Sequence, residues 1–444
     1  MSFLRIAIIA LGSLCTLLPL AGEVLLKPDR TPVSYAGKFS NARVNLPPYR
    51  AKRIEFRGAW VATVENLDIG TCKSAAEFQA AYLAIVNNLK KANFNAILFQ
   101  VRPTCDAFFP SRFNPWSRWM TGREGGNFGD FDPLEFMVRE AHRRGLAFHA
   151  WLNPYRVIGN TRLSKNEYLK TLDQRNFARQ HPELVLSSPT GKGNLLFLDP
   201  GEPEVIKHIT QVVEEIVDNY QVDGIVFDDY FYPYHEIGDI DSRSFAKYNY
   251  QKLSLADWRR NNVTAVIRAV RGVIDRANLQ RQRKVVFGIS PFGIWANKAS
   301  HPDGSLTGGK QSYFAQYADT RKWVREKLID YISPQLYWQF NHNVAAYAAL
   351  VDWWCETVRG TGVRLFISQS ASRIGSSADW SAEEAVNQLR YNCGRPEVSG
   401  TIYYAYRHIF KPGNPVQAEG AARIKRMWRS PAGVPAFPTL QRRR

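Results

Sequence analysis

The sequence predicts a (β/α)8 barrel, a closed ring of eight parallel strands with a helix after each strand. Apolar runs of strand length alternate with amphipathic runs of helix length from residue 57 to residue 406. A right-handed crossover through each helix closes eight such strands most simply into a barrel. An open doubly wound sheet is the alternative, but no glycine-rich turn follows the first strand, as a dinucleotide-binding fold requires.

The strands follow one another along the chain, and nearly every one ends in polar residues. We expect them at residues 57–64, 96–101, 146–152, 224–227, 285–289, 331–337, 364–368 and 401–406. Amphipathic stretches predict helices at residues 78–93, 133–144, 203–220 and 254–278. The barrel should therefore span residues 53–410, with insertions after the third and fourth strands and an extra short strand at 195–198 in the first insertion.

The first 22 residues have the pattern of a secretory signal peptide. Arg5 precedes an apolar run that ends near the small residues Ala21 and Gly22. We therefore expect export to the periplasm or cell envelope, and no transmembrane segment in the mature chain. Cys15 suggests a lipid anchor, but Leu14 is bulkier than the small residue usual before a lipidated cysteine, so anchoring is not expected.

Two segments flank the predicted barrel. Residues 23–52 lack periodicity and are expected to be a linker. Residues 411–444 should contain one helix near 418–428 and then a basic, proline-rich, disordered tail.

The charge and composition limit the kinds of partner. The net charge is +18, but Lys and Arg are spread along the chain, which favours a basic solvated surface over a nucleic-acid site. Aromatic residues make up 13% of the chain, and they either fill the core or line a carbohydrate cleft. Trp116 and Trp119 in one long loop leave both roles open.

Four cysteines follow the signal segment. Because disulfides form in exported proteins, we expect Cys72 to pair with Cys105 and Cys355 with Cys393, although four cysteines allow three connectivities. No Cys-x-x-Cys spacing or paired histidine motif indicates zinc, so neither a metal nor a cofactor is expected.

A barrel gathers the ends of its strands around one mouth, where active sites lie. The residues at these ends are mostly neutral hydrogen-bonding or aromatic groups, namely Glu65, Asn66, Gln100, Arg102, Asn153, Tyr155, Asp199, Asp228, Asp229, Tyr230, Ser290, Gln335, Tyr337, Trp338, Gln369 and Tyr404 to Tyr406. Such a ring suits a hydroxyl-rich ligand such as a glycan better than a phosphate or a metal.

Carboxylates concentrate at the end of the fourth strand, where Asp228 and Asp229 are adjacent. Glycoside cleavage usually uses two carboxyl groups, and the seventh and eighth strands end without one. Two adjacent ionised aspartates repel, so one should keep its proton to higher pH, as a general acid requires. At most one of them faces the lumen unless the backbone turns after the strand.

Six motifs in order resemble the glycosyl-hydrolase-like 10 family: RGAWVATV from Arg57, QVRP from Gln100, AWLNPY from Ala150, LDPG from Leu198, VDGIVFDDYFYP from Val222 and ISPQLYW from Ile332. The resemblance covers residues 53–410. It implies a (β/α)8 barrel of the cell envelope that cleaves peptidoglycan glycan strands, preferring strands stripped of their peptides. Septal division proteins are implied as possible partners.

Peptidoglycan sugars carry 2-acetamido groups, which can replace an enzyme nucleophile. We hypothesise that Asp229 is the general acid and Asp228 orients the acetamido group, with the reverse assignment open. The remaining predicted substrate contacts are Arg102, Asn153, Tyr155, Asp199, Tyr230, Gln335 and Tyr337, with Trp151, Tyr232 and Trp338 as stacking platforms. A non-catalytic glycan-binding barrel and a hydrolase of another polysaccharide are the alternatives.

Overall fold

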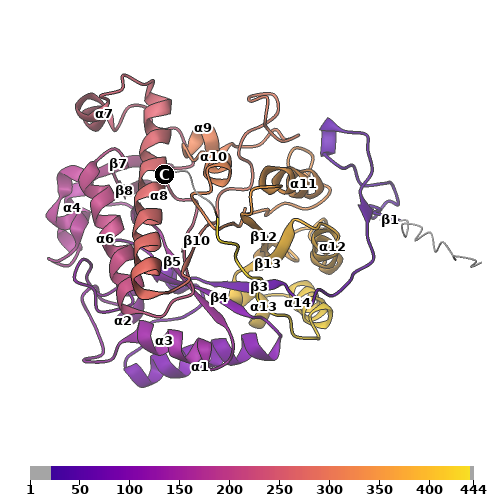
Figure 1. Cartoon of the computed structure of the whole chain (residues 1–444), viewed down its shortest axis with the longest axis horizontal. Helices are drawn as coiled ribbons and strands as arrows, with labels where there is room; N and C mark the ends of the chain where they lie inside the picture. The colour runs from indigo at the N-terminus through magenta and orange to yellow at the C-terminus, as the bar shows by residue number, and fades with distance from the viewer. Residues whose placement is uncertain (1–21, 441–444) are drawn as a thin grey trace, which may run out of the picture.

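The computed structural model describes residues 22–440, and its centre is a closed barrel of eight parallel strands (Figure 1). The barrel strands are β3 (Phe56–Val61), β4 (Ala96–Arg102), β5 (Ala147–Leu152), β9 (Gly224–Phe227), β10 (Val286–Ile289), β11 (Tyr331–Ile332), β12 (Arg364–Ser370) and β13 (Val398–Tyr404). Pairing of β13 with β3 closes the ring. The predicted (β/α)8 barrel is therefore confirmed. The predicted signal peptide and Cys15 fall in residues 1–21, outside the described part of the chain.

Helices surround the strands, as Figure 1 shows. The longer ones are α1 (Ala75–Lys91), α3 (Pro133–His142), α6 (Pro203–Asn219), α8 (Leu255–Arg281), α11 (Tyr347–Val358), α12 (Ala382–Cys393) and α14 (Pro415–Met427). The shorter ones are α2 (Arg118–Thr121), α4 (Lys165–Thr171), α5 (Phe177–Gln180), α7 (Ser242–Tyr248), α9 (Ser312–Ala315), α10 (Thr320–Arg325) and α13 (Tyr406–Phe410). In α6, which corresponds to the amphipathic stretch predicted at 203–220, the apolar face of Val205, Ile209, Val212 and Ile216 is buried.

The insertion after β5 forms a small antiparallel sheet of its own. Its strands are β6 (Arg156–Thr161), β7 (Val185–Thr190) and β8 (Gly193–Leu198), arranged in the order β6-β8-β7. The extra strand predicted at 195–198 is the second half of β8. The insertion after β9 contains α7, and a third insertion, not predicted, separates β10 from α10 at residues 290–319.

The sixth barrel strand is much shorter than the predicted residues 331–337. Only Tyr331 and Ile332 form β11, because Pro334 has no N–H to donate to a neighbouring strand. The chain stays in the sheet layer, since Gln335 forms isolated bridges with Phe292 and Ser368. This irregular end places Gln335 and the residues after it at the barrel mouth.

Aromatic side chains fill the barrel interior. Phe56 stacks on Phe366 with ring centroids 4.3 Å apart, and the Tyr331 hydroxyl lies 2.9 Å from Nδ1 of His149. Gly288 makes room for this layer, because a Cβ atom there would lie 2.0 Å from the Tyr331 ring. The barrel interior is therefore a packed core, as in other barrels of this size.

Both flanking segments are ordered against the barrel. Residues 23–52, expected to be a linker, form the paired strands β1 (Glu23–Val24) and β2 (Asn45–Leu46). The helix expected near 418–428 is present as α14. The tail after it was expected to be disordered, but it is ordered up to residue 440. Phe437 reaches the base of the barrel, where its ring centroid lies 5.9 Å from that of Tyr331.

The predicted disulfides are wrong, because all four described cysteines are free thiols. Cys72 Sγ lies 3.6 Å from the carbonyl oxygen of Gly70, and Cys105 Sγ lies 3.6 Å from that of Arg156. Cys355 is buried, whereas Cys393 is half-buried and contacts the carbonyl of residue 50. Cys72, Cys105 and Cys393 therefore each contact a backbone carbonyl rather than the expected partner cysteine. No helix within residues 22–440 has the length and apolarity needed to cross a bilayer.

Candidate active site

A cleft of about 550 Å³ opens at the carboxyl ends of the barrel strands. Aromatic and polar side chains line it, and its charged groups are Glu65, Arg156, Asp228 and Asp229. The other lining residues are Trp60, Val64, Gln100, Trp119, Trp151, Ile158, Gly159, Asn160, Leu195, Tyr230, Tyr234, Ser290, Gln335, Tyr337 and Tyr404. The cleft is thus in the place expected for an active site of this fold.

Both aspartates reach the cleft because β9 ends at Phe227 and the backbone turns directly after it. The Tyr230 backbone N–H donates to Oδ1 of Asp228 at 3.2 Å, which holds the turn. The alternation of an extended strand, which would have sent one side chain outward, therefore does not apply here. Asp228 and Asp229 are only 4% and 3% exposed, so their ionisation depends on their immediate neighbours.

Asp228 is surrounded by hydrogen-bond donors. Trp151 Nε1 donates to Oδ2 at 2.9 Å, and Asn153 Nδ2 lies 3.1 Å from each carboxylate oxygen. Burial raises the pKa of Asp228, while the positive charge of Arg156 and these donors act in the opposite direction. Donors of this kind favour the carboxylate form and fix its orientation.

Asp229 has a different environment. Burial, and then the charge of Asp228, raise its pKa to about 8. Its Oδ2 atom is buried without a hydrogen-bond partner among the described residues. A buried carboxyl group with a free oxygen and a neighbouring negative charge is stable in the protonated form at neutral pH. The hydrogen-bond donors around Asp228 therefore favour its carboxylate form, and the raised pKa of Asp229 suits a proton donor.

Three further predicted contacts line the cleft with this pair: Tyr230, Gln335 and Tyr337. The Tyr337 ring stacks on that of Tyr404, with centroids 5.9 Å apart. Gln335 Nε2 donates to the carbonyl oxygen of Ser290 at 3.0 Å, which ties β10 to the irregular end of β11. Tyr230 is 37% exposed and presents a ring at the cleft rim.

Two predicted contacts support the site from behind. Asn153 is fully buried and orients Asp228 rather than facing the open cleft. Arg102 is 1% exposed and donates through Nη1 to the carbonyl oxygens of Asn153 and Pro154, at 2.6 and 3.2 Å. The prediction that Arg102 contacts substrate is therefore wrong, because its guanidinium holds the loop that carries Asn153.

Three more predicted contacts are buried in the insertion. Tyr155 is fully buried against Phe231, and Asp199 accepts hydrogen bonds from the Ser244 hydroxyl and from a backbone N–H. The Tyr232 hydroxyl donates to Asp241 at 3.1 Å and is 1% exposed. These side chains hold the insertion together and do not reach the cleft, so their predicted substrate contacts are wrong.

Trp338 lies beside the cleft rather than in its lining. Its ring packs edge-on against Phe292 with centroids 5.3 Å apart. Trp119 does line the cleft, whereas Trp116 packs on the core. The loop that carries both tryptophans thus combines the two roles that the sequence left open.

The most consequential residue that sequence reasoning missed is Arg156. It begins β6, directly after the AWLNPY motif, and its guanidinium carbon lies 4.0 Å from the centroid of the Tyr230 ring. Its position directly after a barrel strand could have marked Arg156 as a mouth residue. Its antiparallel pairing with Phe197 in β8, however, could not be predicted from the local sequence pattern. Trp60 and Tyr234 were also missed as cleft residues.

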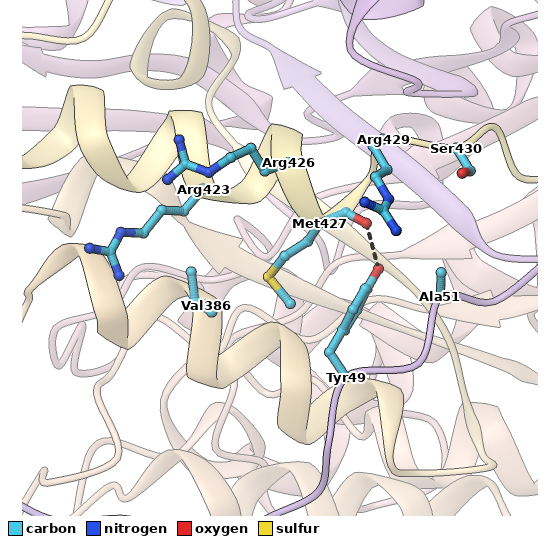
Figure 2. Close-up of a pocket in the computed structure, with 8 residues that line it drawn as sticks. All are labelled: Tyr49, Ala51, Val386, Arg423, Arg426, Met427, Arg429 and Ser430. Carbon is cyan, nitrogen blue, oxygen red and sulfur yellow. Dashed lines mark hydrogen bonds between the residues drawn. The ribbon is translucent and has the colours of Figure 1, made fainter.

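A separate cavity of about 520 Å³ lies between α12, α14 and residues 49–51 (Figure 2). It contains Arg423, Arg426 and Arg429, and the Tyr49 hydroxyl donates to the carbonyl of Met427. None of its lining residues comes from the barrel mouth.

Within residues 22–440, no group of three or more His, Cys, Asp or Glu side chains could hold a metal ion. The candidate site is therefore the cleft that contains the aspartate pair.

A (β/α)8 barrel with two adjacent buried carboxyl groups in its mouth is suited to glycoside cleavage. The glycoside hydrolase domain of PgaB (BpsB) from Bordetella bronchiseptica shares the fold, with a TM-score of 0.53 and 15% identity over 84% of this chain and 99% of that domain.

The profile of the glycosyl hydrolase-like 10 family matches residues 55–402, and the chain belongs to this family. It is 39% identical over 395 residues to glycosyl hydrolase YngK of Bacillus subtilis (strain 168), covering 87% of this chain and 74% of YngK. It is 40% identical over 377 residues to glycosyl hydrolase DigH of Escherichia coli (strain K12), covering 80% of this chain and 84% of DigH.

Proposed function

We propose that this protein is a glycoside hydrolase that cleaves the glycan strands of peptidoglycan, with peptide-denuded strands of N-acetylated sugars as its substrate. The observation that carries the proposal is the aspartate pair, in which Trp151 donates a hydrogen bond to Asp228, while burial and the neighbouring charge of Asp228 raise the pKa of Asp229 to about 8. The family and its named relatives support glycosidase activity. The signal-like N-terminus supports action in the periplasm or cell envelope. A role in division, with septal proteins as candidate partners, is proposed from the family resemblance.

In the proposed reaction Asp229 donates its proton to the glycosidic oxygen as the bond to C1 breaks. The oxygen of the substrate's own 2-acetamido group attacks C1 from the opposite face and forms an oxazolinium ion. Asp228 accepts a hydrogen bond from the acetamido N–H and stabilises the positive charge of this ion. Water then attacks C1 and gives its proton to Asp229, which restores both aspartates and leaves a new reducing end.

Three features of the cleft suit this reaction. Trp151 and Asn153 fix Asp228, so it can orient the acetamido group without its own reorganisation. Tyr230 and Tyr337 present aromatic surfaces of the kind that pack against sugar rings. With Asp229 protonated, Asp228, Glu65 and Arg156 are the charged groups of the lining, which suits a hydroxyl-rich polymer.

The test is cleavage of purified peptide-free glycan strands, measured as new reducing ends and by mass spectrometry of the products. Chitin and a neutral glucan serve as comparison polymers. We expect hydrolysed products from the peptidoglycan strands and none from the glucan, which lacks the acetamido nucleophile. Binding of the strands without new ends would instead identify a non-catalytic glycan-binding barrel, and rapid cleavage of the glucan would exclude substrate assistance.

A further inference from the structure

Arg156 is a charged side chain in the cleft for which the proposed reaction assigns no step. It is half-buried and lines the same cleft as the aspartate pair. Within residues 22–440 its guanidinium makes neither an ion pair nor a hydrogen bond, whereas Arg57, Arg259 and Arg271, which are more deeply buried, all have carboxylate partners. An arginine that is partly removed from water and has free donors is suited to binding an anion.

The position of this guanidinium is fixed by the insertion. Arg156 pairs with Phe197 across the antiparallel strands β6 and β8, and its backbone N–H donates to Oδ1 of Asn153 at 2.9 Å. Its guanidinium carbon lies 4.0 Å from the Tyr230 ring centroid, which is stacking distance. The donors are therefore held at the rim before a ligand arrives, which reduces the ordering cost of binding.

Asp228 does not use these donors. Its two oxygens already accept hydrogen bonds from Trp151, Asn153 and the Tyr230 backbone. Arg156 acts on Asp228 through its charge, which opposes the rise in the pKa of that carboxyl caused by burial. The guanidinium fork consequently remains available to a ligand in the cleft.

We propose that Arg156 binds a carboxylate carried by the glycan, and that this contact selects the substrate. The proposal rests on the proposed function, because N-acetylmuramic acid bears a lactyl carboxylate that is free once the peptide has been removed. An intact stem peptide converts that carboxylate into an amide, and chitin has no equivalent group. Bidentate pairing with a guanidinium requires the ionised acid, so Arg156 discriminates against both neutral forms.

The test compares two substrates that differ only in this charge. They are peptide-free oligosaccharides of alternating N-acetylglucosamine and N-acetylmuramic acid, used as the free acid and as the lactyl methyl ester. The protein should cleave the acid with a kcat/KM about tenfold or more above that for the ester, the range expected for a charge-assisted contact. The Arg156→Gln variant should bring this ratio close to one, and Arg156→Lys should leave an intermediate ratio, because lysine keeps the charge and loses the fork.

Arg162→Gln is the matched control, since Arg162 follows β6 directly, is exposed and does not line the cleft. It should keep the full preference for the acid. An equal loss on acid and ester in Arg156→Gln would overturn the proposal, because it would mean that Arg156 acts only on the aspartate pair. A wild-type protein without preference would overturn it as well.

A binding measurement separates this proposal from the proposed function. Calorimetry with the Asp229→Asn variant should show tighter binding of the acid than of the ester, and Arg156→Gln in the same background should remove the difference. If the acid is preferred in binding but the unmodified protein cleaves neither substrate, the carboxylate site stands and the hydrolase function fails. Equal binding of acid and ester overturns the carboxylate site even if both are cleaved.

Discussion

Both ends of the barrel bury ionisable groups, but the buried groups differ in whether they have hydrogen-bond partners. At the base, His149 is 1% exposed and its Nδ1 lies 2.9 Å from the Tyr331 hydroxyl, within a layer of aromatic rings that meet it edge-on. Burial lowers the pKa of His149 to about 4, so this group is neutral and paired. At the mouth, Asp229 is equally buried, yet its Oδ2 has no partner among the described residues and lies beside another carboxylate.

This difference shows where the fold is optimised for stability and where it is not. Buried polar groups are nearly always hydrogen-bonded, so an unpaired buried carboxyl oxygen costs folding free energy. At the base, His149 and Tyr331 avoid this cost by pairing with each other, and the tail residue Phe437 adds a further ring to their layer. The mouth retains the cost at the position where a proton donor is needed, as functional sites commonly do.

The largest expected effect is on catalysis at the mouth. Replacing Asp229 by Asn removes the transferable proton, and replacing Asp228 by Asn removes the carboxylate that stabilises the charged intermediate. Each substitution should lower kcat on peptide-free glycan strands by about 10²–10⁴-fold. Circular dichroism should show an intact fold in both variants. Full activity in both would refute the assignment of the aspartate pair.

The pH dependence of stability should also differ between the ends. The pKa of Asp229 is about 8 in the folded protein and about 3.9 in an unfolded chain, so its contribution is complete below pH 4 and is lost as the pH rises through 8. Asp229→Asn should therefore become more stable relative to wild type across this window, by at most about 1.4 kcal/mol per pH unit. Urea unfolding at pH 5, 7 and 9 measures it, and a constant difference would contradict the raised pKa.

A substitution at the base should affect stability without affecting catalysis. Phe437 is half-buried against Tyr331 and Phe366, and Phe437→Ala should reduce the free energy of unfolding by about 1–3 kcal/mol while kcat stays unchanged. Val434→Ala in the same tail is the control, because Val434 is exposed and should cost far less. If Phe437→Ala unfolded no earlier in urea than Val434→Ala, the tail would not be part of the core.

The smallest effect is expected at the polar contact of the base. Tyr331→Phe removes the hydroxyl that faces Nδ1 of His149 and should cost about 1 kcal/mol of stability, with little change in activity. Denaturant unfolding at pH 7 measures the cost, and a double variant with His149→Gln shows whether the two residues are coupled. Strict additivity of the two substitutions would mean that the contact contributes nothing.

Much of the architecture could be predicted from the sequence because it depends on local patterns. Alternating strand and helix periods predicted the barrel, and the apolar run Gly224–Phe227 predicted β9 and placed the aspartates at the mouth. The same reasoning failed for Tyr155, Asp199 and Tyr232, since a position after a strand does not reveal which way a side chain turns. It also failed for the disulfides, which require two particular Cβ atoms to meet.

The sequence by itself determined the barrel, its two predicted insertions and the acidic strand end, because each is set by residues close together in the chain. Only the tertiary structure decided how the surroundings of the two aspartates differ. That difference depends on Trp151 and Asn153 from β5 and its loop, which donate to Asp228, whereas Asp229 Oδ2 has no partner within residues 22–440. Burial and hydrogen bonding are properties of the assembled fold, and they set the pKa values on which the chemistry of this cleft depends.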